Sequence, residues 1–549
     1  MNCIESIKKA FVDHIKSHYP LDSEILRQIE LTINTDERKQ AFGDITTNSA
    51  LILAPIINQQ PRVIASQLAQ GFTHLLVERT EVAGPGFINI VLKSAAWATL
   101  AKELFETDTL FFKPEDKQLP MVNIEFVSAN PTGPLHFGHG RGGILGDVLA
   151  KVLRFVGYVV NTEFYINDAG AQIEKLGNSF KIRCQQAAGM DIQMPEDAYH
   201  GSYLIDLAQG YIHTHGIEGL NKDHMFFAAY AQDHMLLNIK KTLADYGIAF
   251  DTWFSEKSLH SSNSIVHALD ILEKNGYLYR HEDAVWFRST VFGDDKDRVV
   301  RKSDGTLTYI AADIAYLQNK VDRGAQKLIM VLGHDHHSYA TRLETVRQAL
   351  GLTQIPLDVI LYQLVKIKQG DQQVRMSKRK GAIVTLQDVI DTVGSDVARF
   401  FYLHRKADAQ LEFDLDLALT KTEDNPVYYV QYAYVRTNSI LDKAQEVKEL
   451  QLITPDDMSH IGQEEAFILK KIASLKVLLT DIARHYQTHL LTHYSIELAH
   501  AFHAYYRHNR IIDMSNIAKS RARLGLIHGI NSTFKTVLSL MGLSTPERM

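Results

Sequence analysis

A glycine-rich turn between a strand and a helix constrains the fold of this chain more than any other stretch. The sequence GPLHFGHGRGG, residues 133–143, follows the apolar run MVNIEFV and precedes a helical pattern that reaches Gly157. A second apolar run, YVVNTEFYIN, comes next. Strand, helix and strand in this order are typical of a βαβ unit, whose helix N-terminus can hold a phosphate group. The sequence therefore predicts a parallel sheet with a nucleotide site at this turn.

The glycines of the turn fit two kinds of nucleotide site. Gly138, Gly140 and Gly143 match the G-x-G-x-x-G pattern of dinucleotide-binding folds, and Glu163 lies where an acid would bind a ribose. In those folds the first glycine follows the strand almost at once, whereas residues 128–137 separate the two here. The turn also contains two histidines, which have no role in a dinucleotide site. An NAD-dependent oxidoreductase is therefore the weaker alternative.

A second motif lies in a basic segment after the last predicted strand. The segment KIKQGDQQVRMSKRKG spans residues 366–381. The combination of H-x-G-H after the first strand with M-S-K after the last resembles the class I aminoacyl-tRNA synthetases. The second signature departs from the family pattern, because Arg375 and Arg379 stand in place of lysine and serine. Charge is kept at the first of these positions, and Lys378 is present, so we expect the function to survive.

Further stretches resemble one family of that class, the arginyl-tRNA synthetases. They are FGD and EVAGPGFIN near the beginning, EFVSANPTGPLHFGHG and DGTLTYIAADIAY in the middle, and NPVYYVQYAYVR and PERM toward the end. The resemblance implies a ligase of protein biosynthesis that uses ATP to convert L-arginine to arginyl-adenylate, releasing pyrophosphate. The arginyl group then passes to the 3' end of tRNA(Arg), releasing AMP. The expected partners are L-arginine, tRNA(Arg), and ATP with Mg²⁺ as a substrate.

The same resemblance assigns roles at the two signatures. His136, His139 and Lys378 would stabilise the negative charge that gathers on the transferred phosphate and on the departing pyrophosphate. Imidazole donors, backbone amides at a helix N-terminus and a mobile lysine are suited to that charge. Gly138 would let the adenine approach the backbone closely. The complete expected ATP site is His136, Gly138, His139, Asp335, Met376, Ser377 and Lys378.

Two acids are candidates for binding the arginine side chain. Glu125 lies in IEFVSAN and Asp313 in TYIAAD, where the sheet edge should open. Carboxylates that pair in a bidentate way distinguish arginine from lysine by geometry as well as by charge. From the residues alone, each acid is also compatible with a structural role. The resemblance implies that both hold the guanidinium group, that Tyr309 packs against it and that Asn130 fixes the amino-acid end.

The stretch GHDHH, residues 333–337, gathers histidine and aspartate after the predicted strand KLIMVL. These residue types bind metals, but adjacent side chains rarely all face one ion. The carboxyl edge of a parallel sheet is where nucleotides bind. We therefore expect Asp335 to contact ATP and His336 to contact arginine, and we expect no structural metal.

The stretch NPVYYVQYAYVR is a predicted helix with several tyrosines, which would either fill a core or stack on unpaired bases. The resemblance places anticodon binding in the C-terminal helices and contact with the tRNA elbow in the N-terminal domain. The expected tRNA contacts are Tyr428, Tyr429, Tyr432 and Met549. A non-catalytic RNA-binding relative is a third alternative, disfavoured because both signature histidines and the signature lysine are present together.

The order of the elements predicts an α/β protein with three domains. A Rossmann-like parallel-sheet catalytic domain spans residues 113–392 and contains a helical insertion at about 184–290. An α+β N-terminal domain precedes it at 1–112, and an all-α C-terminal domain follows at 393–549. The catalytic strands are expected at residues 121–127, 158–167, 306–310, 327–333 and 357–367.

Composition limits the class of protein and its partners. The 549 residues are 45% hydrophobic and carry a net charge of -6, so a polyanion would have to be held by local basic patches. One candidate patch is the segment around the second signature, and another lies at residues 506–523. Two distant cysteines, Cys3 and Cys184, argue against a disulfide framework. No apolar run approaches the roughly 20 residues that span a bilayer. We expect a soluble, cytoplasmic monomer.

Overall fold

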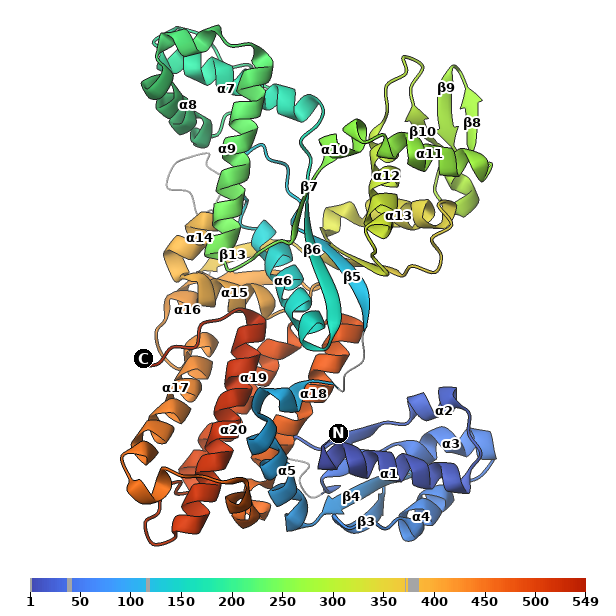
Figure 1. Cartoon of the computed structure of the whole chain (residues 1–549), viewed down its shortest axis with the longest axis vertical. Helices are drawn as coiled ribbons and strands as arrows, with labels where there is room; N and C mark the ends of the chain where they lie inside the picture. Colours follow the sequence, from blue (N-terminus) through green and yellow to red (C-terminus); the bar gives the residue numbers. More distant parts are fainter. Residues whose placement is uncertain (1, 37–41, 115–118, 371, 374–384) are drawn as a thin grey trace.

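The computed structural model describes residues 2–36, 42–114, 119–370, 372–373 and 385–549. Three parts follow one another along the chain: an N-terminal part, a central part around a parallel sheet, and a C-terminal bundle of helices (Figure 1). This arrangement confirms the predicted fold class. Within the described ranges, no helix is long and apolar enough to cross a membrane.

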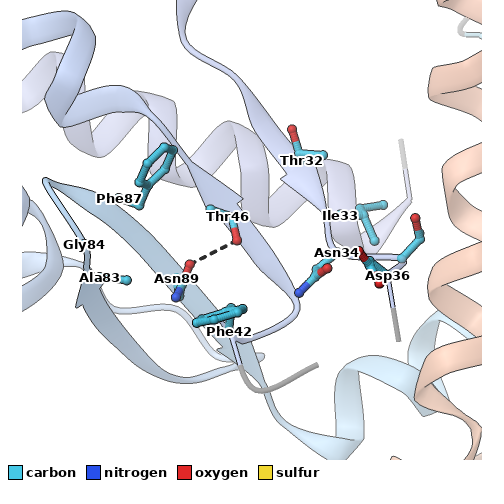
Figure 2. A pocket seen from close by; sticks show the side chains of 11 residues that line it. Thr32, Ile33, Asn34, Asp36, Phe42, Thr46, Ala83, Gly84, Phe87 and Asn89 are labelled. Atoms are coloured by element: carbon cyan, nitrogen blue, oxygen red, sulfur yellow. Dashed lines mark hydrogen bonds between the residues drawn. The ribbon is translucent and has the colours of Figure 1, made fainter. Parts of the chain in front are cut away.

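The N-terminal part is an antiparallel sheet with helices packed beside it. The strand order is β1-β2-β4-β3, and β3 and β4 form a hairpin around Pro85, in which Ala83 pairs with Phe87. A cleft of ≈ 550 Å³ opens beside these strands, with the rings of Phe42 and Phe87 and the amide of Asn89 along it (Figure 2). The elements are α1 (Cys3–His18), α2 (Ser23–Gln28), β1 (Leu31–Ile33), β2 (Ile45–Thr47), α3 (Ser49–Ile57), α4 (Pro61–Gly71), β3 (Val77–Ala83) and β4 (Phe87–Leu92).

The central part is built on a five-stranded sheet with the order β12-β11-β5-β6-β7. Every neighbouring pair in it is parallel. Helix α6 (His139–Phe155) connects β5 to β6, which confirms the predicted βαβ unit. Gly146 lets this helix approach the sheet, because a Cβ there would collide with the ring of Phe126. The strands are β5 (Leu119–Phe126), β6 (Tyr158–Ile166), β7 (Thr252–Ser255), β11 (Lys327–Gly333) and β12 (Leu357–Tyr362).

The predicted helical insertion is two separate lobes in the structure. The first consists of the helices α7 (Ala171–Ala187), α8 (Ser202–His215) and α9 (His224–Asp245), after which the chain returns to the sheet as β7. The second lobe is not all helical, because it contains a three-stranded sheet of order β10-β9-β8. Its elements are α10 (Glu256–Ser261), α11 (Ser264–Lys274), β8 (Leu278–His281), β9 (Ala284–Phe287) and β10 (Arg298–Arg301).

Three further predictions about strands are wrong. The strand predicted at 306–310 is only an isolated bridge at Leu307, and helix α12 (Tyr309–Asp322) begins within it. The strand predicted at 357–367 divides into β12 and β13 (Val365–Gln369), which belong to different sheets. Strands also continue beyond residue 393, because β15 (Leu411–Asp414) pairs with β13 in parallel.

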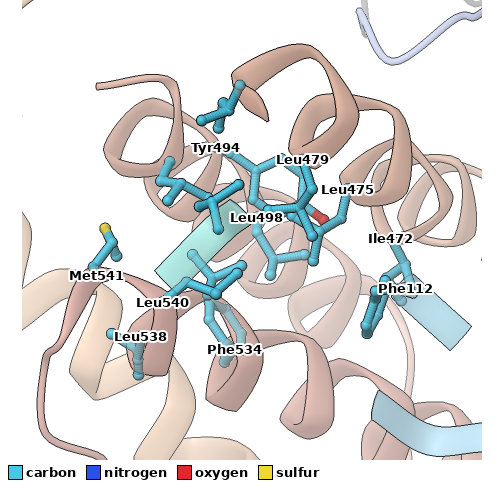
Figure 3. Packing of buried hydrophobic residues seen from close by; sticks show 14 of the residues in the cluster. Phe112, Ile472, Leu475, Leu479, Tyr494, Leu498, Phe534, Leu538, Leu540 and Met541 are labelled. Carbon is cyan, nitrogen blue, oxygen red and sulfur yellow. The ribbon is translucent and has the colours of Figure 1, made fainter. Parts of the chain in front are cut away.

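The C-terminal part is a bundle whose helices share one large apolar core (Figure 3). Helix α17 begins with a favourable cap, because the side chain of Asn425 accepts a hydrogen bond from the backbone N–H of Val427 and Pro426 occupies the first turn. The bundle helices are α17 (Pro426–Gln445), α18 (Ala466–His485), α19 (Leu490–His508) and α20 (Ile517–Met541). Core residues labelled in Figure 3 include Phe112, Ile472, Leu475, Leu498, Phe534 and Leu538.

The N-terminal part is joined to this bundle by a buried ion pair. Asp44, in the FGD stretch before β2, lies 2.6 Å from the ammonium group of Lys470 on α18. Both side chains are buried, with exposed fractions of 4% and 5%. The other oxygen of Asp44 accepts a hydrogen bond of 2.7 Å from the backbone N–H of Leu92. Breaking one partner of such a buried pair is strongly unfavourable. The two parts are therefore held in one relative position.

Candidate active site at the carboxyl edge of the parallel sheet

The chain leaves β5 through an unusual backbone conformation. Val127 and Ser128 have φ values of 68° and 40°, which residues with side chains, and β-branched ones above all, rarely adopt. The turn places the hydroxyl of Ser128 between two strands, where it accepts from the N–H of Tyr165 at 3.0 Å and donates to Glu125 at 2.9 Å. Strained backbone of this kind gathers at functional sites. It marks the carboxyl edge of the sheet as the candidate site.

Each of the two signature histidines is held in place by a hydrogen bond to its own Nδ1 atom. Nδ1 of His136 accepts a hydrogen bond from the N–H of Gly138 at 3.1 Å, and Nδ1 of His139 accepts from the N–H of His136 at 3.0 Å. A neutral imidazole that accepts at Nδ1 carries its proton on Nε2. Burial lowers the pKa of His136, and burial together with His136 lowers the pKa of His139 to about 4. Both rings are therefore neutral Nε2–H donors near pH 7.

The other glycines of the turn have a packing role. A Cβ on Gly140 would come within 2.6 Å of Leu386 and 2.9 Å of the ring of Tyr402. A Cβ on Gly142 would meet the ring of Tyr362 at 2.5 Å. The glycine pattern that suggested a dinucleotide turn is thus explained by how closely the first turns of α6 approach their neighbours.

The residues expected from the second signature, Met376, Ser377 and Lys378, lie outside the described ranges. The chain is described again from Thr385, which forms a backbone bridge with His136. The N–H of Leu386 also donates to the carbonyl of Leu135 at 2.7 Å. The segment that contains the second signature therefore rejoins the described chain beside the first signature, although the two are far apart in sequence.

Asp313 lies on the first turns of α12 and forms no direct ion pair among the residues that the structure describes, although the nearby charge of Arg342 lowers its pKa. Its Oδ1 accepts a hydrogen bond of 3.0 Å from the hydroxyl of Tyr339. Burial raises the pKa of Asp313 to about 6, and the nearby charges of Glu256 and Glu125 add to the increase. The net pKa is still raised, so the site places an acid without a direct ion pair in a poorly solvated position, where a cation would be bound favourably.

Glu125 has a different environment, because its charge is already compensated. Its Oε2 lies 2.8 Å from the ammonium group of Lys320 and accepts from the hydroxyl of Tyr316 at 2.9 Å. Lys320 also pairs with Glu163 at 2.8 Å, and Arg323 pairs with Glu163 at 2.6 Å. Burial would raise the pKa of Glu163, but these cations lower it to about 2. Glu163, the ribose-binding acid of the dinucleotide alternative, is thus committed to a buried ion-pair network.

A third acid faces the same region and was not among the residues predicted from the sequence. Glu256 is the first residue of α10 and directly follows β7, so it also lies at the carboxyl edge of the sheet. Burial raises its pKa, although a hydrogen bond from Tyr165 opposes the increase. Its charge in turn raises the pKa of Asp313. The only signal for Glu256 in the sequence is that it follows the short apolar run TWFS. That run lies in the segment interpreted as a helical insertion.

The remaining predicted substrate residues are more exposed. Tyr309 is the first residue of α12, and 66% of it is exposed. Asn130 is exposed in the loop after β5. Asp335 and His336 lie in a short 3-10 helix after β11, and Asp335 is close enough to oppose the lowering of the pKa of His139. Within the described residues, no group of three or more histidine, cysteine or acidic side chains could hold a metal ion.

Three of the four residues predicted to contact tRNA line two different clefts, one of which is also lined by Thr35 and Asp36 of the N-terminal part. Tyr432 and Met549 lie along one cleft, together with Arg436 and Arg510. Tyr429 lies along another, and its hydroxyl is 2.9 Å from Nδ1 of His500. Tyr428 is half-buried and packs against the apolar core.

Comparisons with known proteins agree along the whole chain. Three family models match: the arginyl-tRNA synthetase N-terminal domain at residues 5–92, the class I tRNA synthetase (R) catalytic domain at 101–400, and the DALR anticodon-binding domain at 430–549. The chain is 42% identical over 522 residues to an arginine–tRNA ligase of Desulforamulus reducens, covering 93% of this chain and 92% of that one.

Other relatives give the same result. An arginine–tRNA ligase of Anoxybacillus flavithermus is 38% identical over 560 residues, with 100% of both chains covered. The solved arginyl-tRNA synthetase of Thermus thermophilus has the same fold, with a TM-score of 0.75 at 20% identity, covering 99% of this chain and 100% of that one. The dinucleotide alternative is therefore excluded, and the chain belongs to the arginyl-tRNA synthetases, class I ligases that use ATP to join arginine to its tRNA.

Proposed function

We propose that the carboxyl edge of the sheet binds ATP with Mg²⁺ as a substrate complex and arginine next to it. The observation that carries this proposal is the shared tautomer of His136 and His139. Because both Nδ1 atoms accept backbone N–H groups, both Nε2–H groups are free to donate to a phosphate at the N-terminus of α6. Gly138 is assigned to the adenine, Asp335 to the nucleotide, and Met376, Ser377 and Lys378, which lie outside the described ranges, to the phosphates.

The first reaction is attack of the arginine carboxylate on the α-phosphate of ATP, with pyrophosphate as the leaving group. Negative charge increases on the phosphate oxygens during this step, and donors that are already in place stabilise that increase without reorganising. Neutral imidazoles are suitable because their donor capacity does not change near pH 7. In the second reaction, a terminal hydroxyl of tRNA(Arg) attacks the adenylate carbonyl and releases AMP.

Arginine is recognised mainly by the acids that form no direct ion pair within the described part of the chain. Asp313 and Glu256 meet this condition, and both have raised pKa values. We propose that they hold the guanidinium group, with Tyr309 packed against it. Glu125, which Lys320 already compensates, takes part more weakly and sets the position of the strand end through Ser128. Asn130 and His336 contact the amino-acid end.

Contact with tRNA is proposed for both outer domains. In the helical bundle, Tyr432 and Met549 share a cleft that contains arginines, and aromatic and cationic groups suit an unstacked anticodon base. In the N-terminal domain, the cleft of Figure 2 offers the exposed rings of Phe42 and Phe87 and the amide of Asn89, whose oxygen accepts from the hydroxyl of Thr46 at 3.0 Å. Stacking surfaces and an amide are what a flipped-out base of the tRNA elbow requires.

The test is ATP–pyrophosphate exchange with the purified chain. Exchange should depend on arginine, should not be supported by lysine, and should be compared with and without tRNA(Arg). Absence of arginine-dependent exchange in the presence of tRNA would contradict the proposed site. We also propose that the chain is a cytoplasmic monomer, for which sedimentation equilibrium gives a direct measurement of mass.

A further inference from the structure

Helix α15 (Ser395–Leu403) lies between α6, which begins at the active site, and the helical bundle (Figure 1). It packs against α6 on one side and against α17 on the other. None of its residues belongs to the substrate site proposed above. Three of its side chains, however, form polar contacts with segments that are distant in sequence, and those segments lead to the active site in one direction and to a tRNA cleft in the other.

Toward the active site, α15 supports the first turn of α6 through Tyr402. The hydroxyl of this fully buried residue donates to the carbonyl of Phe137, within the H-x-G-H signature, at 2.8 Å. The ring of Tyr402 fills the space next to Gly140. Because Phe137 lies between the two signature histidines, a shift of Tyr402 moves the backbone that carries both imidazole donors.

One turn earlier, Arg399 holds α6 at a second point. Its buried guanidinium group pairs with Asp147 on α6. It also donates to the carbonyl of Tyr246 at 2.7 Å and to that of Met541 at 2.9 Å. Arg399 therefore connects α6 with the ends of α9 and α20. The residue after α20, Gly542, has a φ of 70°, and a Cβ there would collide with the guanidinium group.

At the opposite end of α15, Asp396 binds the segment that follows α20. One oxygen accepts from the N–H of Ser544 at 3.0 Å, and the other accepts from the Ser544 hydroxyl and from the amide of Gln431 at 2.7 Å. Gln431 belongs to α17, next to Tyr432, and the segment of Ser544 leads to Met549. One carboxylate thus contacts α17 and the C-terminal segment, two of the three chain segments that line the cleft of Tyr432 and Met549; the third is residues 506–512.

We propose that α15 is a positioning element for adenylate formation, in which Asp396 makes the placement of the H-x-G-H turn depend on the seating of α17 and of residues 543–549. The inference rests on the active site proposed above. A helix of 9 residues transmits a displacement at Asp396 to Arg399 and Tyr402 as a nearly rigid body. The donors of His136 and His139 are then out of place for the transition state, while the arginine pocket on α12 is unaffected.

Ser544→Ala and Asp396→Asn test the inference, measured by ATP–pyrophosphate exchange at saturating ATP and tRNA(Arg). Each should lower kcat with an unchanged KM for arginine, and Asp396→Asn should reach roughly tenfold or more, because small displacements of catalytic groups have large effects on rate. Ser544→Thr keeps the hydroxyl and should restore kcat. The double variant should be no slower than Asp396→Asn alone, because both changes break the same connection.

Glu465→Gln is the matched control. It removes a fully buried carboxylate of the same helical bundle, paired with Lys519 and Arg523, that does not contact α15. It should lower thermal stability and leave kcat unchanged in the folded enzyme. Ser544 is exposed, so its alanine variant should fold even if Asp396→Asn does not.

Two results would overturn the inference: a normal kcat in folded Ser544→Ala and Asp396→Asn enzymes, or an equal loss of kcat in Glu465→Gln. A failure of the proposed function is distinguishable, because it would remove arginine-dependent exchange from the wild-type enzyme as well.

Discussion

The carboxylates at the active site differ in whether the protein itself compensates their charge. Glu125 has Lys320 within 2.8 Å, whereas the raised pKa values of Asp313 and Glu256 reflect burial without an ion pair. A guanidinium group brought to the second kind of acid forms a direct ion pair, for which the described residues supply only more distant charges, Arg342 near Asp313 and His260 near Glu256. It gains less at Glu125, because Lys320 repels it. The free energy of arginine binding should therefore depend most on Asp313 and Glu256.

Asp313→Asn should weaken arginine binding by about 2 to 5 kcal/mol, the range for breaking one partner of a buried charge pair. The amide would also present donors toward the donors of the guanidinium group. Calorimetric titration of arginine measures the change, and ATP affinity should hardly move. Asp322→Asn, at the exposed end of the same helix, is the control. Wild-type arginine affinity in folded Asp313→Asn would remove this residue from the substrate site.

Arginine binding should become tighter as the pH rises from 5 to 7. The pKa of Asp313 in the folded protein is about 6, above the ordinary value of 3.8, so its stabilising contribution to the unliganded fold is present at low pH and is lost as the pH rises through 6. The ionised form is the one that binds the guanidinium group. Titrations at several pH values should show this dependence in the wild type and a weaker one in Asp313→Asn, where Glu256, whose pKa is also raised, remains. His139, with a pKa of about 4, does not titrate in the same range.

His139→Asn separates the structural role of the ring from its catalytic role. The amide oxygen can replace Nδ1 as the acceptor for the N–H of His136, but the variant lacks the Nε2–H donor. The rate of adenylate formation should fall by about 10² to 10³, the usual effect of removing one preorganised donor. Single-turnover rapid quench measures that step, and the melting temperature should change little. A rate like that of the wild type would show that the ring is only structural.

The signature residues could be predicted from the sequence, but their surroundings could not. His136 and His139 stand in a short motif whose spacing fixes their place at the start of a helix. Glu256 belongs to no motif, and it reaches the site only because β7 returns to the sheet between two lobes of the insertion. The pairing of Glu125 with Lys320 is equally invisible in the sequence, since it joins residues almost 200 positions apart on different elements.

At the scale of single elements, the start of α6 depends on the absence of a side chain at Gly140. Gly140→Ala would push Leu386 or Tyr402 away and shift the turn that carries the histidines. We expect the rate of adenylate formation to fall much more than stability does. Gly210→Ala in α8 is the control, because nothing lies within 4 Å of its added Cβ, and it should stabilise the protein by up to about 1 kcal/mol. ATP–pyrophosphate exchange assays and thermal melts of both variants measure these effects on rate and on stability.

Elements with a strong periodic pattern were predicted correctly, as were the apolar runs at 121–127 and 327–333, but two other apolar runs were not. The βαβ unit and the bundle helices have long, regular patterns. The run TLTYI has only five residues, and its second half forms the first turn of α12. The run at 357–367 is continuous in sequence, but its two halves pair with different neighbours, β11 and β15. The division of this run into two strands is decided by pairing partners that are distant in the chain. Local propensity carries no information about such partners.

At the scale of the molecule, substrate binding and tRNA binding should be separable. Tyr432→Ala should raise the KM for tRNA(Arg) and leave arginine affinity unchanged, because its cleft is built by α17, residues 506–512 and Met549 rather than by the sheet. Loss of one stacking contact typically costs about 1 to 3 kcal/mol. Aminoacylation at varied tRNA concentration gives the KM. An equal loss of arginine affinity would instead place Tyr432 in the structural core.

The buried ion pair of Asp44 and Lys470 gives the enzyme a fixed internal distance. It fixes the separation between the cleft of the N-terminal domain and the cleft of Tyr432 and Met549. A tRNA that occupies both clefts must present its elbow and its anticodon loop at that separation. Only then is the second contact formed within the complex that the first contact has already made, which increases the total affinity. We therefore expect a tRNA with one base pair more or less in its anticodon stem to lose one of the two proposed contacts, which would make length a second criterion by which the enzyme selects its partner.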